Sequence, residues 1–342
     1  MIPFLHLGPL TIPVYGLMIA CAMLAAFFLL RADLKRRGFG PDSEADAEAL
    51  IAVPCLAGII GAKLYHVFES PRELFADPYH QIFSQYGFAW FGGLLAGFAA
   101  FLLLARSIAK RTSKAGRTVS ILEFLDVGSP AAALGYGIGR IGCLLSGDGD
   151  YGIPTSLPWG MSFPHGLVPT TQRVHPTPIY ELIVACVIAW LLWCLGARTV
   201  RSERFNSGQD KLREQSAEDA TPGKRKNSGG SRGAGAASRD AKMRGASAVA
   251  ALSAPPGSTQ RSQTGDAAPP AMQSPAYGQV FAAYLVLTGI ARFLVEFIRI
   301  NPRSFFGMSN AQAASVASVI VGVILWWKLS RATPDRVSRA KT

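Results

Sequence analysis

Long apolar segments constrain this 342-residue chain more than any other feature. A helix of about 20 apolar residues spans the hydrocarbon core of a bilayer. With 49% hydrophobic and only 16% charged residues, the composition is also typical of a membrane protein. The sequence therefore predicts an all-α integral membrane protein, a seven-transmembrane helix bundle. The expected spans are 12–30, 50–68, 87–105, 121–140, 178–196, 278–298 and 311–329, the fourth being the weakest because Glu123, Asp126 and Pro130 interrupt it.

Basic residues follow the first, third and seventh of these segments. They are Arg31, Lys35, Arg36, Arg37, Arg106, Lys110, Arg111, Lys114, Arg117, Lys328, Arg331, Arg336, Arg339 and Lys341. Under the positive-inside rule, this pattern predicts an N-terminus outside and a cytoplasmic C-terminus. The formal net charge of +12 then reflects topology and contact with anionic membrane lipids, not nucleic-acid binding. Because no lysine or arginine precedes the first span, we expect that span to be retained and not cleaved as a signal peptide.

One segment has a composition unlike the rest. Residues 198–277 are rich in Ser, Gly, Ala, Pro and mixed charge, with few large apolar groups. Such a segment cannot bury enough surface to offset the entropy of ordering. The predicted organisation is helices one to five with an external loop (1–197), a disordered cytoplasmic linker (198–277), helices six and seven (278–330) and a basic cytoplasmic tail (331–342). The linker is compatible both with a plain spacer and with a lipid or protein docking segment.

The cysteines give no sign of a disulfide framework or a metal site. Four of the five, Cys21, Cys55, Cys186 and Cys194, lie inside apolar spans, and no spacing typical of metal ligands occurs. We therefore expect neither a metal nor a cofactor. Cys143 differs because it lies within the charged stretch GRIGCLLSGDGDYG, residues 139–152.

The predicted topology places polar groups of all seven spans at one depth near the outer leaflet. Arg140 ends the fourth span, and Arg292, Glu296 and Arg299 share one face of the sixth through i, i+4 and i, i+3 spacing. The other members are Lys63 and His66 on the second span, and Tyr15, Trp90, Tyr180, Glu181 and Gln312 at the starts of the remaining spans. Charge at such a depth in a membrane protein indicates a functional site.

Several of these residues also have an ordinary structural explanation. Tyr15 and Trp90 fit an interfacial aromatic belt, Lys63 fits a side chain reaching the headgroups, and His66 fits a hydrogen-bonded histidine between helices. Arg292 with Glu296 fits a clasp between helices. Arg140 is harder to explain this way, since Gly137, Gly139 and Gly142 leave its backbone open to a bound group. Arginines with a carboxylate at headgroup depth suit a phosphate ester whose acyl chains stay in the bilayer.

The motifs YGLM at 15, GAKLYHV at 61, FGGLLAG at 91, FLD at 124, GRIGCLLSGDGDYG at 139, HPTPIYE at 175, RFLVEFIR at 292 and GMSNAQ at 307 resemble the prolipoprotein diacylglyceryl transferase family. The resemblance implies a multi-pass enzyme of the bacterial inner membrane. Such enzymes move the diacylglyceryl group of phosphatidylglycerol to the lipobox cysteine of prolipoprotein signal peptides and release glycerol 1-phosphate. It further implies that Arg140 and Arg292 manage phosphate charge. Residues expected to bind phosphatidylglycerol or to match important family positions are Tyr15, Asp126, Gly139, Gly142, Gly152, Glu296 and Arg299.

The chain departs from the family pattern close to the expected site. Phe91 stands where the family has a histidine, and Cys143, Ser146 and Asp148 replace two asparagines and a glutamate. We expect His66 or Asp148 to act as the base that deprotonates the thiol, with Cys143 as a transient acceptor a weaker alternative. The functional classes left open are this transferase, a related enzyme with an altered acceptor or lipid donor, and a non-catalytic phospholipid-binding protein. A channel or a metal hydrolase fits less well.

Overall fold

The computed structural model describes residues 2–69, 71–83, 89–114, 119–219, 276–302 and 307–339. Its helices are α1 Val14–Arg36, α2 Ser43–Glu69, α3 Pro71–Ala76, α4 Pro78–Phe83, α5 Trp90–Lys114, α6 Ile121–Ser146, α7 Thr177–Asp219, α8 Gln279–Val295 and α9 Asn310–Arg339. Each predicted span overlaps one of these helices. The all-α prediction requires one correction, because two antiparallel hairpins are present: β1 Phe4–Leu7 with β2 Leu10–Pro13, and β3 Met161–Phe163 with β4 Thr170–Val174. The first pairs backbone groups before α1 and the second pairs those of the connection between α6 and α7, where the helical ladder is not available.

Five of the described helices are long and apolar enough to cross a membrane. They are α1, α2, Phe91–Lys114 of α5, Thr177–Ser202 of α7 and Asn310–Arg331 of α9. Helix α8 is apolar but has only 17 residues. Large apolar side chains such as Phe28, Leu56 and Trp190 are more than half exposed, as a lipid-facing surface requires. The chain is therefore a multi-pass membrane protein.

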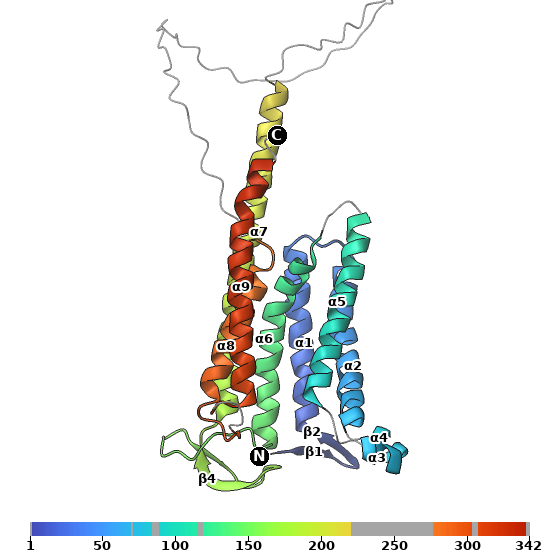
Figure 1. Ribbon diagram of the computed structural model, residues 1–342, viewed down its shortest axis with the longest axis vertical. Helices are drawn as coiled ribbons and strands as arrows, with labels where there is room; N and C mark the ends of the chain where they lie inside the picture. Colours follow the sequence, from blue (N-terminus) through green and yellow to red (C-terminus); the bar gives the residue numbers. More distant parts are fainter. Residues whose placement is uncertain are drawn as a thin grey trace, which may run out of the picture. The chain divides into compact units, whose positions relative to one another are not determined.

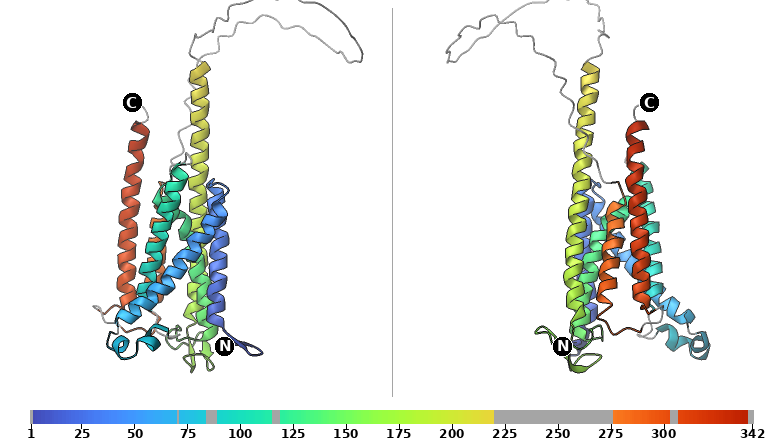
Figure 2. Two further views of the ribbon diagram at one scale, coloured as in Figure 1. Left: turned by 90° about the vertical axis from the view of Figure 1, so that its right-hand side faces the viewer. Right: turned by 60° about the vertical axis from the view of Figure 1, so that its left-hand side comes forward.

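Glycines bring α2 and α5 into close contact. A Cβ atom at Gly61 would lie 2.2 Å from the Cβ of Ala96 and 2.7 Å from the carbonyl oxygen of Gly92. Small residues of this kind allow helix backbones to approach within a membrane. Figures 1 and 2 show α2 beside α5, α1 beside α6 and α8 beside α9. The motifs at 61 and 91 thus have a packing role that is separate from any catalytic one.

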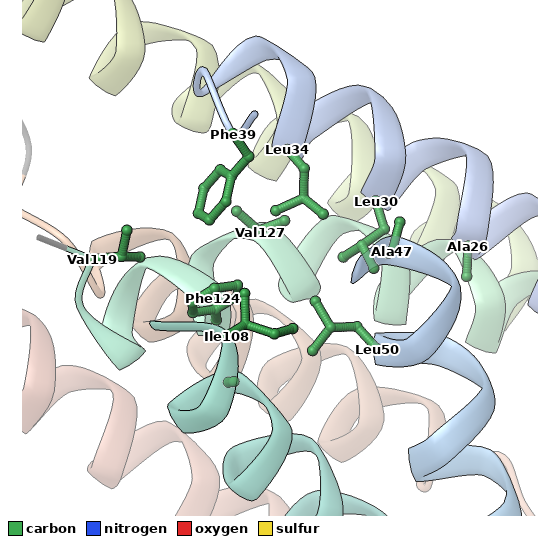
Figure 3. Close-up of a cluster of buried hydrophobic side chains, with 12 residues drawn as sticks. Ala26, Leu30, Leu34, Phe39, Ala47, Leu50, Ile108, Val119, Phe124 and Val127 are labelled. Atoms are coloured by element: carbon green, nitrogen blue, oxygen red, sulfur yellow. The ribbon is translucent and has the colours of Figure 1, made fainter. Parts of the chain in front are cut away.

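A buried core fixes α6 against α1, α2 and α5 at the end opposite the hairpins (Figure 3). Leu34 and Phe124 are fully buried, and the ring of Phe124 meets that of Phe39 edge to face at 5.4 Å. Because a helix rises about 1.5 Å per residue, Arg140 lies roughly 24 Å along α6 from Phe124. The core therefore sets the direction in which α6 presents its polar end.

Helix α7 extends beyond the predicted end of the fifth span. The chain forms two compact units, Met1–Glu203 with Ser274–Thr342, and Arg204–Gln273. The first part of the predicted linker, residues 198–219, is helical, which corrects the predicted boundary. This stretch contains no proline, and extending an existing helix costs much less than starting one. The rest of the predicted disordered linker, residues 220–275, lies outside the described residues. Helix α9 continues into the predicted tail as far as Arg339, and residues 340–342 also lie outside the described residues.

Candidate functional site

The end of α6, the loop that follows it, the start of α7 and the end of α8 meet at one end of the bundle (Figure 1). Helix α6 ends at Ser146 and is capped by Gly147, which adopts a left-handed conformation (φ 59°) and donates its N–H to the carbonyl of Cys143 at 3.0 Å. A Cβ atom at Gly147 would lie 2.7 Å from the Cα of Gly166. Glycine at this position therefore allows the loop to turn back over the end of α6.

Gly152 joins three parts of the site. Its N–H donates to the carbonyl of His175 at 2.8 Å, and it forms an isolated bridge with Arg299. A Cβ atom at Gly152 would lie only 2.5 Å from the carbonyl oxygen of Ile298. The predicted importance of Gly152 thus has a structural cause, because it lets the loop reach the segment after α8.

Glu181, near the start of α7, lies at the centre of the site. Its carboxylate contacts Arg140 Nε at 2.5 Å, Arg292 Nη1 at 3.1 Å and Arg299 Nη1 at 3.3 Å. The Tyr136 hydroxyl donates to it at 2.6 Å, and only 4% of the side chain is exposed. One buried carboxylate therefore holds three guanidinium groups from different parts of the chain.

Two further carboxylates complete the charge pattern. Asp150 pairs with both Arg140 and Arg299, while Glu296 contacts Arg292 Nη2 at 3.2 Å and Arg299 Nε at 3.8 Å. Burial alone would raise the pKa of Asp150, but the hydrogen bond and charge of Arg299, with the charge of Arg140, lower it overall. The pKa of Arg299 is raised, because the contact with Asp150 outweighs burial. Each arginine thus contacts at least two carboxylates; we call these three arginines with Asp150, Glu181 and Glu296 the arginine cluster.

Cys143, Asp148 and Asp150 lie together beside the arginine cluster, with ligand-type atoms within 4.8 Å of one another. Burial, followed by the nearby charge of Asp150, raises the pKa of Asp148. The three groups have donor types that a metal could use, but Arg140 Nη1 lies 3.6 Å from the Cys143 sulfur and both oxygens of Asp150 accept from guanidinium groups. Two adjacent arginines repel a cation, so the arrangement suits proton transfer better than metal binding.

Other residues predicted for the site line the seam between α1 and α6. A Cβ atom at Gly142 would lie 3.1 Å from Tyr15 Cδ2, and one at Gly139 would lie 3.7 Å from Ile19 Cδ1. Tyr15 is about half exposed. Ser146 donates its hydroxyl to the carbonyl of Gly142 at 2.7 Å within α6. Gly139 and Gly142 thus allow α1 to pack against α6 beside Arg140, and Ser146 forms a hydrogen bond within the last turn of α6.

The predicted residues on α2 and α5 lie apart from the arginine cluster. His66 is partly buried on α2, which packs against α5, α1 and the short helices α3 and α4. Within the described residues, no hydrogen bond or ion pair joins His66 to the three arginines. Phe91 is exposed in the first turn of α5, next to Trp90, whose side chain lies outside the described part of the chain.

Asp126 and Gln312, which were expected to have functional roles, cap the starts of helices. The carboxylate of Asp126 accepts the N–H groups of Gly278 at 2.7 Å and Phe281 at 2.8 Å, at the start of α8. Asp126 precedes Arg140 by roughly 21 Å along α6. Gln312 forms a capping box with Ser309, the two exchanging side-chain to backbone hydrogen bonds at 3.0 and 3.2 Å. Both side chains thus satisfy backbone groups at the start of a helix, Asp126 for α8 and Gln312 for α9.

Tyr136 was not expected in the site, and Glu181 and Asp150 were expected only as members of the outer polar layer and of the charged stretch 139–152. Tyr136 precedes Arg140 by four residues, and its ring lies under the guanidinium group, 4.7 Å from ring centre to Cζ. That i, i+4 spacing was a signal that could have identified Tyr136. Glu181 stands in HPTPIYE, but its three partners come from α6, α8 and beyond, so spacing could not reveal them.

The sequence model described as prolipoprotein diacylglyceryl transferase matches residues 3–209 and 268–328. Three similar relatives each carry the name phosphatidylglycerol--prolipoprotein diacylglyceryl transferase. The protein of Clostridium tetani is 26% identical over 314 residues, 91% of each chain. The protein of Bordetella avium is 33% identical over 199 residues, covering 57% of this chain and 70% of the relative; that of Corynebacterium glutamicum (strain ATCC 13032) is 30% identical over 226 residues, covering 60% and 65%. The chain therefore belongs to the prolipoprotein diacylglyceryl transferase family.

Proposed function

We propose that this protein transfers the diacylglyceryl group of phosphatidylglycerol to the lipobox cysteine of prolipoproteins, the first step of lipoprotein maturation. Family membership and the names of the relatives support this reaction. The observation that carries the proposal is the convergence of Arg140, Arg292 and Arg299 on Glu181. Three guanidinium groups in a partly buried setting bind and orient a phosphate far better than isolated surface charges do.

The reaction requires one bond to form and one to break. The thiolate sulfur of the substrate attacks the glycerol carbon that bears the phosphate, a carbon–sulfur bond forms, and the carbon–oxygen bond breaks with glycerol 1-phosphate leaving. Negative charge increases on the departing phosphate, and Arg140 and Arg292 would stabilise it. Gly139, Gly142 and Tyr15 would admit the glycerol backbone along the seam between α1 and α6, while Glu296 and Arg299 hold the cluster in place.

Asp148 is the favoured base for the thiol proton. It lies beside the arginine cluster, and its raised pKa makes its carboxylate a stronger base than an ordinary aspartate. His66 is the alternative, but α2 does not bring it into contact with the three arginines in the described chain. Cys143 is a poor transient acceptor, because a thioether formed on it would have to be broken again by a second thiol.

The proposal includes the seven spans and their orientation. Helices α6 and α8 would be the two spans added to the five long apolar helices. The arginine cluster lies at the end of the bundle opposite the basic connection between α1 and α2 (Figure 1). With basic connections inside, the N-terminus and the site face outward from the bacterial inner membrane, where phosphatidylglycerol and a secreted signal peptide meet. Residues 198–277 and the tail would then be cytoplasmic.

Complementation tests this function directly. The full chain would be expressed in bacteria depleted of their own transferase, beside Arg140→Ala and the control Arg31→Ala, which removes a partly buried arginine paired with the exposed Glu44. We expect the unaltered chain and Arg31→Ala to restore the mass shift of a reporter prolipoprotein, and Arg140→Ala to fail. If the inserted, folded chain binds phosphatidylglycerol but leaves the reporter unmodified, the protein is a lipid-binding relative or uses a different acceptor.

A further inference from the structure

The arginine cluster is neutral without any substrate. Three arginines face three carboxylates, Asp150, Glu181 and Glu296, and every guanidinium contacts at least two of them. Adding a phosphate anion to this partly buried set would leave an unbalanced negative charge, which is costly away from water. One carboxylate must therefore give up its arginines when phosphate enters.

Asp150 is the carboxylate best placed to leave. Its side chain is 28% exposed, against 4% for Glu181 and 1% for Glu296. Glu181 is held by three guanidinium groups and the Tyr136 hydroxyl, and Glu296 accepts a further hydrogen bond from Asn301. Displacing either one would expose buried polar partners without acceptors.

The main chain of Asp150 is held by contacts that do not involve its carboxylate. Its carbonyl oxygen accepts from the Thr177 hydroxyl and, at 3.4 Å, from Arg299 Nη1. A rotation about the side-chain bonds would carry the carboxylate away from the arginines without moving this anchored backbone. The displacement is thus a rotamer change, which is fast and needs no loop opening.

The carboxylate also has the geometry of the group that would replace it. One oxygen of Asp150 accepts from Arg140 and the other from Arg299. A phosphodiester likewise has two non-bridging oxygens on one central atom, and each of them can accept from a separate guanidinium group. We infer that Asp150 is a positioning residue that occupies the phosphate site of the resting protein and is exchanged for the phosphate group of the substrate. This inference rests on the proposed function.

Binding measurements on the full-length protein in detergent test the exchange. Dioctanoyl phosphatidylglycerol, glycerol 1-phosphate and dioctanoyl phosphatidylcholine would be titrated by calorimetry into the wild type, Asp150→Asn and Asp150→Ser. Glu44→Gln is the matched control, since it removes one carboxylate from the exposed pair with Arg31 at 2.7 Å. We expect both Asp150 variants to bind the glycerol lipid and glycerol 1-phosphate about tenfold more tightly, the change expected for one charge-assisted hydrogen bond, with no such change in Glu44→Gln.

The outcomes separate this inference from the proposed function. A purely structural Asp150 would splay the arginines when altered, so unchanged or weaker phosphate binding by the two variants overturns the exchange. Tighter binding of the zwitterionic lipid to the same extent also overturns it, because the gain would not be specific to an anionic phosphate group. If the wild type does not distinguish phosphatidylglycerol from phosphatidylcholine, the proposed function fails and the inference fails with it. A KM for phosphatidylglycerol that falls in Asp150→Asn, with stronger inhibition by glycerol 1-phosphate, supports it independently.

Discussion

Replacing Glu181 by Gln tests whether one buried carboxylate organises the site. Glutamine keeps the size of the side chain, but its amide nitrogen would face a guanidinium group as a second donor. The carboxylate now contacts three arginines at 2.5 to 3.3 Å with only 4% of its side chain exposed. Removing one partner from a buried ion pair costs about 3–5 kcal/mol. At about 2–4 °C per kcal/mol for a large domain, the midpoint of thermal unfolding should fall by about 6–20 °C.

Activity should fall along with stability. Arg140 and Arg292 would lose the carboxylate that fixes their orientation toward the phosphate. Loss of one positioned donor to a developing charge costs a factor of about 100 to 1,000 in rate, and we expect a loss of that order in transfer to a lipobox peptide. The assay combines intrinsic tryptophan fluorescence on heating with transfer of labelled diacylglyceryl from phosphatidylglycerol.

Glu44→Gln is again the control. Glu44 is 54% exposed in its pair with Arg31, and exposed pairs contribute about 0–1 kcal/mol, so its unfolding midpoint should shift by no more than about 4 °C. The reasoning about Glu181 is refuted if Glu181→Gln unfolds within that same interval and retains most of its transfer rate.

Three further predictions concern other parts of the chain. Asp126→Asn should lower stability by about 1–2 kcal/mol, as loss of a charged helix cap does; hydrogen exchange at the first amides of α8 should speed up, while kcat/KM of the folded protein should stay within twofold. Because burial and Asp150 raise the pKa of Asp148, its base form is lost as the pH falls through a value above the ordinary 3.9 or so, and the transfer rate should fall there. The Asp150→Asn variant removes the negative charge of Asp150, so the pH at which the transfer rate falls should be lower in this variant. A pH dependence of the transfer rate that is the same as in the wild type would exclude Asp148 as the base. Gly61→Leu should prevent α2 from packing on α5, because a Cβ atom alone would lie 2.2 Å from that of Ala96, and the yield of folded protein in membranes should drop sharply.

The membrane fold was accessible from the sequence because it depends on local composition. Long apolar runs specify helices whatever their neighbours are, and each predicted segment overlaps a helix; five described helices are long and apolar enough to span a membrane. The end of α7 was not accessible in the same way. Residues 198–219 have linker-like composition, yet they continue a helix that already exists, and composition does not register that advantage.

Asp126 and Gln312 each cap a helix, a role that was not expected from the sequence. Both are polar residues in apolar helices, which is a sound reason to suspect a functional site. Their side chains instead satisfy backbone N–H groups, Asp126 at the start of α8 and Gln312 at the start of its own helix. For Asp126 the partners are more than 150 positions away in the chain, so only the packing of α6 against α8 could reveal them.

By itself the sequence determined the class of protein and its long apolar helices, and it singled out Arg140 and Arg292 as candidates, because these follow from composition and from short motifs. Only the tertiary structure decided how those arginines are neutralised. Glu181 and Asp150 gain their importance from contacts between α6, α7, α8 and the loop after α6. Electrostatic interaction depends on distance and burial, not on separation along the chain, so the charge balance of the site could not be calculated until the helices were in place.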